Sequence, residues 1–179
     1  MRDVTLLGTR LVVGGYLAVH GAQKLFGVFG GPGLTKAGAG FDGIGLTPGK
    51  QMAALAGATE LGGGLLTAAG AADPAGPLAI IGAMTVASVT HRASGPLAAN
   101  RGFELPLTNL AAAAGLLASG PGRLRLGPPL SRRLTMVAAA GGALLAAASL
   151  ARMLTTARDR AKAIQTTSAP DTETPAARP

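Results

Sequence analysis

Seven polar side chains lie within or beside long apolar stretches of the sequence, and their types suit them to chemistry. They comprise two imidazoles, two carboxylates, an ammonium, a phenol and an amide: His20, His91, Glu60, Glu104, Lys24, Tyr16 and Gln23. Such a set can move protons, hold a quinone-like head group or bind a small polar ligand. The alternative is a buried salt-bridge network that only fixes how helices pack.

Other chemistries have weaker support. The chain has no cysteine, which excludes disulfides, iron–sulfur clusters and thiol nucleophiles within it. His20 and His91 could in principle bind haem iron, and two His with two Glu could ligate a metal, but no ligand spacing appears, so we predict no metal site. Glycines at 38, 40 and 43 match G-x-G-x-x-G without a preceding strand, and we interpret them as part of a flexible loop. The sequence gives no basis for predicting a Ser-His-Asp catalytic triad.

Five apolar segments must position these side chains. Only 13% of the 179 residues are charged, against about a quarter in ordinary soluble domains. A helix of about 20 apolar residues crosses a bilayer, whereas a barrel would need short strands of alternating polarity. The sequence therefore predicts an all-α, polytopic membrane helical bundle. We expect a four-helix core and a possible fifth, C-terminal helix, at residues 4–26, 50–72, 77–90, 103–119 and 134–154.

The alternating direction of these segments brings the polar residues to one half of the bundle. Tyr16, His20, Gln23 and Lys24 share a helical face. The end of the first segment, the first half of the second, the end of the third and the start of the fourth lie on the same side. We therefore expect the imidazoles, carboxylates and ammonium to meet at a common depth, beneath the Gly-rich connection at residues 27–49.

Small residues indicate which face of the second segment points inward. Ala53, Gly57, Glu60 and Gly64 follow one another at three- and four-residue spacings. Small side chains let neighbouring helices approach closely, so this face, including Glu60, is expected to turn into the bundle.

The C-terminal third differs from the rest. We divide the chain into a membrane domain at residues 1–125, a basic linker with an additional apolar helix at 126–154, and a polar tail at 155–179 that we expect to be disordered. The net charge of +8 is not interleaved with aromatic rings, since Trp is absent and Tyr occurs once. This argues against nucleic acid as a partner and for anionic lipid headgroups of a bilayer.

Basic residues also bear on orientation, because they concentrate in cytoplasmic loops. With four crossings, a cytoplasmic N-terminus places the basic linker and tail in the cytoplasm, and we predict this arrangement. If residues 134–154 also cross, five spans with the N-terminus outside become the competitor.

Several short motifs occur in a fixed order between residues 4 and 125. They are RLVVGGYLAVHGAQKLF at 10–26, a Gly-rich loop with Phe41, Gly45, Leu46 and Pro48, ELGGG at 60–64, GFE at 102–104 and GPG at 120–122. In this order they resemble the DoxX family of small bacterial membrane proteins. The resemblance implies a four-helix membrane core with polar residues at His20, Lys24, Glu60 and Glu104.

The resemblance also implies a link to redox chemistry. The family is named after membrane subunits similar to those of thiosulfate:quinone oxidoreductases, and mycobacterial relatives are linked to oxidoreductase assemblies. The fifth segment and basic tail depart from the plain family pattern, and without cysteine any thiol chemistry would come from a partner.

Our first hypothesis is therefore a multi-pass subunit of a redox or quinone-linked assembly in the inner membrane of a bacterium, with quinone as the implied cofactor and other protein subunits as partners. One alternative is a non-catalytic scaffold. Another is a small-solute or proton transporter. The only sign of an internal repeat is that each pair of segments has a His late in its first helix and a Glu in the next, His20 with Glu60 and His91 with Glu104.

Overall fold

The computed structural model describes residues 1–167, and every regular element in that part of the chain is helical. Six α-helices follow one another: α1 (Arg2–Phe26), α2 (Gly33–Gly43), α3 (Gly49–Ala69), α4 (Ala75–His91), α5 (Glu104–Ser119) and α6 (Arg132–Thr167). Three single 3₁₀ turns, Val28–Gly30, Arg92–Ser94 and Ala98–Asn100, lie in the connections. The predicted all-α class is confirmed.

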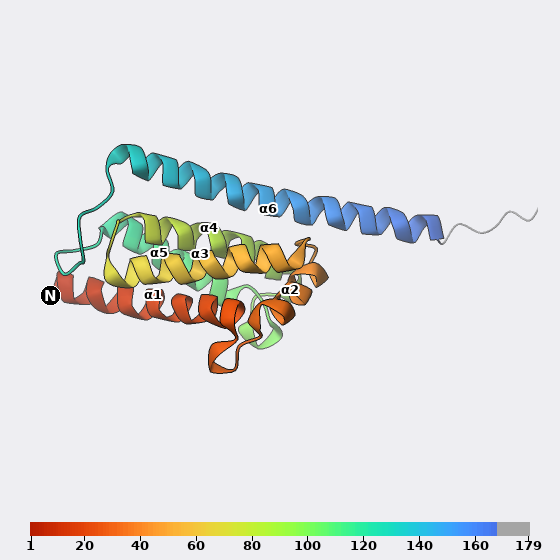
Figure 1. The fold of residues 1–179 in the computed structure, drawn as a ribbon, viewed down its shortest axis with the longest axis horizontal. Coiled ribbons are helices and arrows are strands. Elements are labelled where there is room, and N and C mark those ends of the chain that lie inside the picture. The colour runs from red at the N-terminus through yellow and green to blue at the C-terminus, as the bar shows by residue number, and fades with distance from the viewer. Residues whose placement is uncertain (168–179) are drawn as a thin grey trace, which may run out of the picture.

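The helices α1, α3, α4 and α5 pack as a bundle with alternating directions (Figure 1). One end, which we call the loop end, contains the start of α1 and the segment 120–131 between α5 and α6. The other, the α2 end, contains α2 and the α4–α5 connection. Leu17, Ile80, Met84 and Ala113 form the core cluster, and they come from α1, α4 and α5.

Glycines set the distance between α1 and α3. A Cβ on Gly64 would lie 2.5 Å from the carbonyl oxygen of Gly14, and one on Gly21 would lie 2.4 Å from the backbone nitrogen of Leu61. The backbones therefore touch, which only glycine permits. Ala53, Gly57, Glu60 and Gly64 are all buried, as predicted for the inward face of α3.

The connection between α1 and α3 is more ordered than a loop. The glycines at 38, 40 and 43 lie in helix α2, so their interpretation as part of a flexible loop was wrong. The physical reason is packing: α2 lies so close to the start of α3 that a Cβ on Gly38 would sit 2.9 Å from the Cα of Lys50.

Helix α6 runs from the loop end to the α2 end and packs along α4 (Figure 1). Near its far end, Arg152 donates to the carbonyl of Thr47 at 2.9 Å, and Arg160 donates to the carbonyls of Asp42 and Gly43 at 2.7 and 3.2 Å. Helix α6 is thus hydrogen-bonded to the end of α2 and to the connection between α2 and α3.

The boundary expected at residue 155 is displaced, because α6 continues to Thr167. Residues 155–167 contain Ala, Arg, Lys and Gln, which favour helix, and neither Gly nor Pro, which would end it. The rest of the expected tail, residues 168–179, lies outside the described residues.

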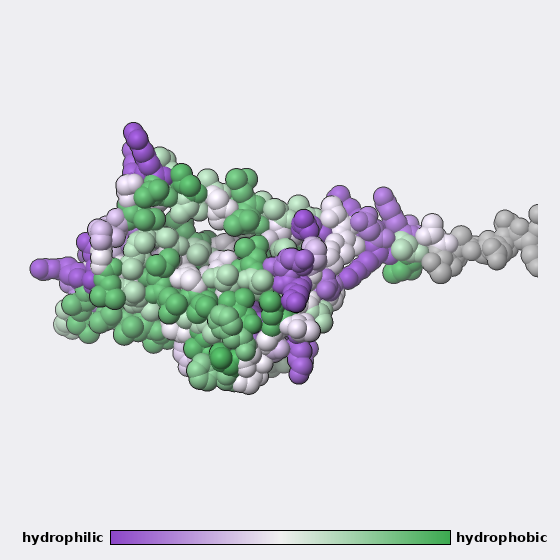
Figure 2. All heavy atoms as spheres, viewed as in Figure 1, coloured by the Kyte–Doolittle hydropathy of each residue, from purple (hydrophilic) through white to green (hydrophobic). Residues whose placement is uncertain are grey.

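Two helices of the described chain, Arg2–Phe26 and Arg132–Thr166, are long and apolar enough to cross a membrane. Helices α4 and α5 have 17 and 16 residues, fewer than the about 20 of a typical span. Figure 2 shows hydrophobic side chains over the middle of the visible face and hydrophilic ones towards its ends.

Candidate functional site

An ion pair joins α1 to α3 in the half of the bundle nearer the α2 end. The ammonium of Lys24 donates to Oε2 of Glu60 at 2.5 Å, and it is the only ion pair within residues 1–167. Glu60 exposes 8% of its side chain and Lys24 exposes 25%. The carboxylate is therefore secluded, while the ammonium reaches towards the surface.

The elements around this pair explain its position. Gly21 on α1 and Gly57 on α3 allow backbone contact within a turn of the pair. A short distance along, the Gln23 side chain donates to the carbonyl of Phe29 at 3.5 Å, which links α1 to the turn before α2. Close helix contact on one side and the α2 connection on the other hold the pair in place.

His20 and Tyr16 lie one and two turns before Lys24 on α1, and both are exposed. In the described chain no hydrogen bond connects either of them to Glu60. They therefore flank the pair on the surface of α1 rather than completing a closed pocket around the carboxylate.

His91 and Glu104 lie at the same end of the bundle, but they bind a different structure. Nδ1 of His91 is 2.9 Å from the carbonyl oxygen of Arg101, and Oε2 of Glu104 accepts from the backbone N–H of Ala98 at 2.8 Å. Both side chains hold the α4–α5 connection. Six of the seven sequence-identified residues are thus divided between an interhelical pair, an exposed α1 face and a loop anchor, and Gln23 binds the turn before α2.

The most extensive polar network lies at the opposite end, around Arg10. This residue is 3% exposed, and its guanidinium donates to the carbonyls of Pro121 and Leu124. No role was assigned from the sequence to Arg10, the first residue of the motif at 10–26. The available signal was Gly-Pro-Gly at 120–122, which offers backbone carbonyls not used by a helix.

Asp73, between α3 and α4, belongs to this network. Burial raises the pKa of its carboxyl, and the nearby positive charges of Arg10 and Arg125 partly offset the increase. Its backbone carbonyl accepts from Leu130 at 2.7 Å, so the α3–α4 corner is also tied to the segment 120–131.

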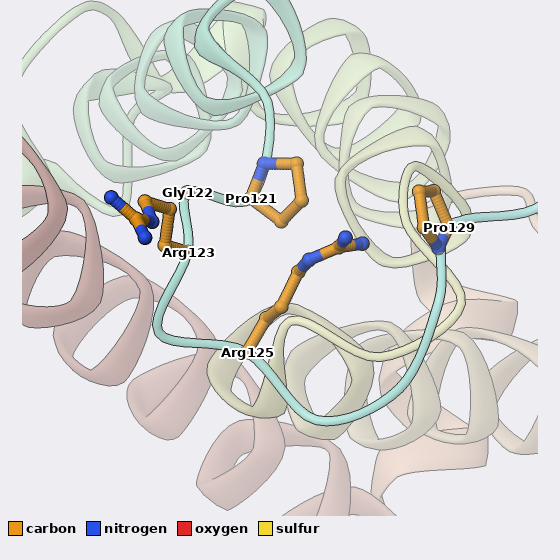
Figure 3. A pocket seen from close by; sticks show the side chains of 5 residues that line it. All are labelled: Pro121, Gly122, Arg123, Arg125 and Pro129. Atoms are coloured by element: carbon orange, nitrogen blue, oxygen red, sulfur yellow. The ribbon is translucent and has the colours of Figure 1, made fainter.

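A cavity of about 450 Å³ opens in the same segment (Figure 3). It is lined by Pro121, Gly122, Arg123, Arg125 and Pro129. Among the described residues, no three His, Asp or Glu side chains gather as a metal site would require.

Comparison with protein families bears directly on this arrangement. Residues 5–93 match the family model DoxX. The chain contains a DoxX domain. The match takes in α1 to α4 and includes both Lys24 and Glu60, whereas Glu104, the cavity and α6 lie beyond it. No curated protein and no solved structure matched the chain.

The DoxX domain and the two long apolar helices together indicate a membrane protein. The family resemblance found in the sequence is thereby confirmed, over residues 5–93 of the 4–125 first assigned to it.

Proposed function

We propose that this protein is a membrane subunit of a redox or quinone-linked assembly, with the Lys24–Glu60 pair as its polar site. The observation that carries the proposal is a carboxylate buried between two helices of the DoxX domain and paired with an ammonium that remains partly accessible. Ionisable groups at membrane depth are rare and usually functional.

The chemistry suits a quinone. Reduction of a quinone to a quinol takes up two protons with two electrons, so its carbonyl oxygens need nearby donors. Lys24 can donate to a carbonyl oxygen, while Glu60 can hold or release a proton within the bundle. His20, exposed one turn away, is a further group able to relay protons. The electrons would come from a partner subunit.

The path of α6 favours five crossings. Because α6 extends between the two ends of the bundle, its basic second half lies at the α2 end with Lys36, Lys50, Arg92 and Arg101. The loop end has fewer basic residues: Arg2, Arg123, Arg125, Arg132 and Arg133. By the positive-inside rule we propose that the α2 end faces the cytoplasm of a bacterial inner membrane, which places the N-terminus outside, opposite to the four-span prediction.

Quinone binding tests the proposal. The purified protein in nanodiscs would be titrated with a short-chain ubiquinone or menaquinone analogue and followed by equilibrium dialysis. We expect saturable binding that Glu60→Gln and Lys24→Met each weaken about tenfold, which is the loss of one charge-assisted hydrogen bond. The exposed Lys36→Met variant is the matched control. No saturable binding, or equal binding by all four proteins, would overturn the proposal.

A scaffold role is the second candidate, and α6 is the observation that favours it. Most of its apolar side chains, among them Leu134, Val137 and Leu144, are exposed. Its charged second half carries Arg158 and Lys162, which are also exposed. A helix that packs on its own bundle along one side only has a face free for lipid or for another subunit.

Deletion of residues 132–179 tests the scaffold because it removes α6 but keeps the segment bound by Arg10. Loss of co-purifying subunits with retained quinone binding would favour the scaffold role, whereas unchanged subunits would exclude α6 as their docking site.

A further inference from the structure

The cavity at the loop end is basic, and its arginines have no protein partner. Arg123 and Arg125 line it, and in the described part of the chain neither guanidinium makes a hydrogen bond or an ion pair. Arg132 and Arg133 add two more positive charges at the start of α6. Unpaired guanidinium groups around a cavity are suited to a bound anion.

The acidic groups at this end form no ion pair with the two arginines in the described part of the chain. Asp3 accepts from the backbone N–H of Arg123 at 2.9 Å, so its carboxylate fixes the chain rather than the guanidinium. Asp73 lies close enough to Arg125 for the positive charge to lower the pKa of its carboxyl, but no ion pair joins the two side chains within residues 1–167. Asp3 and Asp73 are two carboxylates beside the four arginines at positions 123, 125, 132 and 133, so positive charge is in excess around the cavity.

The cavity wall is held in place before any ligand arrives. Arg10 donates to the carbonyls of Pro121 and Leu124, and the N–H of Leu126 donates to the carbonyl of Ala69 at 2.9 Å. At the start of the segment, Arg2 donates to the carbonyl of Ser119 at 2.9 Å. A binding loop fixed in this way loses little conformational entropy when it binds.

The two arginine side chains that line the cavity point in different directions. In Figure 3, Arg125 extends into the space between Pro121 and Pro129, whereas Arg123 points away from them. Arg125 is thus placed to contact a bound group directly, and Arg123 adds positive potential beside it.

The location identifies the chemistry of the anion. The cavity lies where α1 and α6 begin and α5 ends, at the limit of the two apolar helices. If these helices span a bilayer as proposed, this is the depth of lipid headgroups. Phosphate is the anionic group common to these headgroups, and arginine binds it through paired N–H donors. We propose that the cavity formed by residues 121–129 binds a phosphate group, with Arg125 as the direct ligand, supplied by an anionic phospholipid or by a soluble phosphate compound.

Native mass spectrometry of the delipidated full-length protein can test the site and distinguish the sources. The protein would be titrated separately with phosphatidylglycerol, phosphatidylcholine and inorganic phosphate. We expect phosphatidylglycerol to bind at least about tenfold more tightly than phosphatidylcholine, and Arg125→Gln to remove that preference. Arg125→Lys should retain part of it, because the charge remains while the paired donors are lost.

Arg158→Gln is the matched control, since Arg158 is an exposed arginine at the opposite end of the molecule. It should bind phosphatidylglycerol as the wild type does. Binding of inorganic phosphate that requires Arg125, without any lipid preference, would assign the cavity to a soluble phosphate compound. Identical titrations for wild type and Arg125→Gln, with both proteins folded by circular dichroism, would overturn the proposal.

Discussion

At the scale of single residues, the pairing of Lys24 with Glu60 matters most, because the carboxylate is the more deeply buried partner. Removal of the ammonium leaves a buried charge without compensation, whereas conversion of the carboxylate to an amide leaves a neutral polar group. The two single substitutions are therefore not equivalent.

We expect Lys24→Met to lower the free energy of unfolding by about 1–3 kcal/mol, less than for a fully buried pair because Lys24 is partly exposed. Glu60→Gln should cost less, and the double variant should be less destabilised than the sum of the single ones. Unfolding of the detergent-solubilised protein by a chemical denaturant would measure this, with Lys36→Met as the exposed control. Strict additivity would mean that the two side chains do not interact.

A second residue-scale prediction concerns Asp73 and pH. Because burial raises the pKa of this carboxyl above its ordinary value of 3.8, the folded state favours its protonated form. The stability it contributes is complete below that ordinary value and is lost as pH rises through the folded-state pKa. We expect the stability of Asp73→Asn relative to wild type to increase with pH over this window.

Thermal unfolding of the two proteins at matched pH values would show this trend. A difference that stays constant with pH, or that decreases, would show that the charges of Arg10 and Arg125 outweigh burial.

The sequence predicted at which end of the bundle the site residues lie, but not which groups they contact. Depth follows from helix length and chain direction, so Lys24 and Glu60 could be expected to meet. His91 and Glu104 lie at the predicted end, yet nearby backbone groups of the α4–α5 connection bind them first. Arg10 was given no role because its acceptors lie more than a hundred residues away in the sequence.

At the scale of elements, the contact of α1 with α3 depends on glycine at a few positions. Gly21 has backbone atoms of Leu61 and Gly57 within 2.5 Å of where a Cβ would be, whereas Gly15, also in α1, has nothing within 4 Å. The two positions give a matched comparison within one helix.

We expect Gly21→Ala to destabilise the protein by about 1–3 kcal/mol, because the backbones must separate to admit a methyl group. Gly15→Ala should be neutral or stabilising by up to about 1 kcal/mol, through the better helix propensity of alanine. Unfolding midpoints in one detergent would compare them. Equal midpoints for the two variants would contradict the close contact.

Element boundaries were largely predictable because Gly and Pro punctuate the chain. The left-handed Gly27 and Gly70, with φ of 71° and 62°, end α1 and α3 near the expected positions. The end of α6 could not be predicted in this way, because a charged segment that forms a helix has the same composition as a polar tail.

At the scale of the whole molecule, the choice between the predicted four and the proposed five membrane crossings depends on α6. Its 36 residues would extend about 54 Å, well beyond the about 30 Å of a hydrocarbon core. If α6 crosses as we propose, its far end lies on the same side as the α4–α5 connection.

The absence of native cysteine makes this testable by thiol labelling. We expect Ser94→Cys and Thr166→Cys to react with a membrane-impermeant maleimide from one side of oriented vesicles, and Ser131→Cys to react only from the other. Sodium dodecyl sulfate gels with a pegylated maleimide would report the labelling. If Thr166→Cys is labelled from the same side as Ser131→Cys, α6 does not cross.

The attachment of Arg10 to the segment at 121–124 has a consequence for biosynthesis. If the first helix crosses the bilayer as we propose, it enters with a guanidinium whose acceptors are still untranslated, since they follow 111 and 114 residues later. At about 5–20 residues per second the ribosome needs roughly 6–23 s to reach them. Until then Arg10 must be kept hydrated, at the bilayer surface or by the insertion machinery. On this topology, the first helix reaches its final position only after the segment that follows α5 has been synthesised.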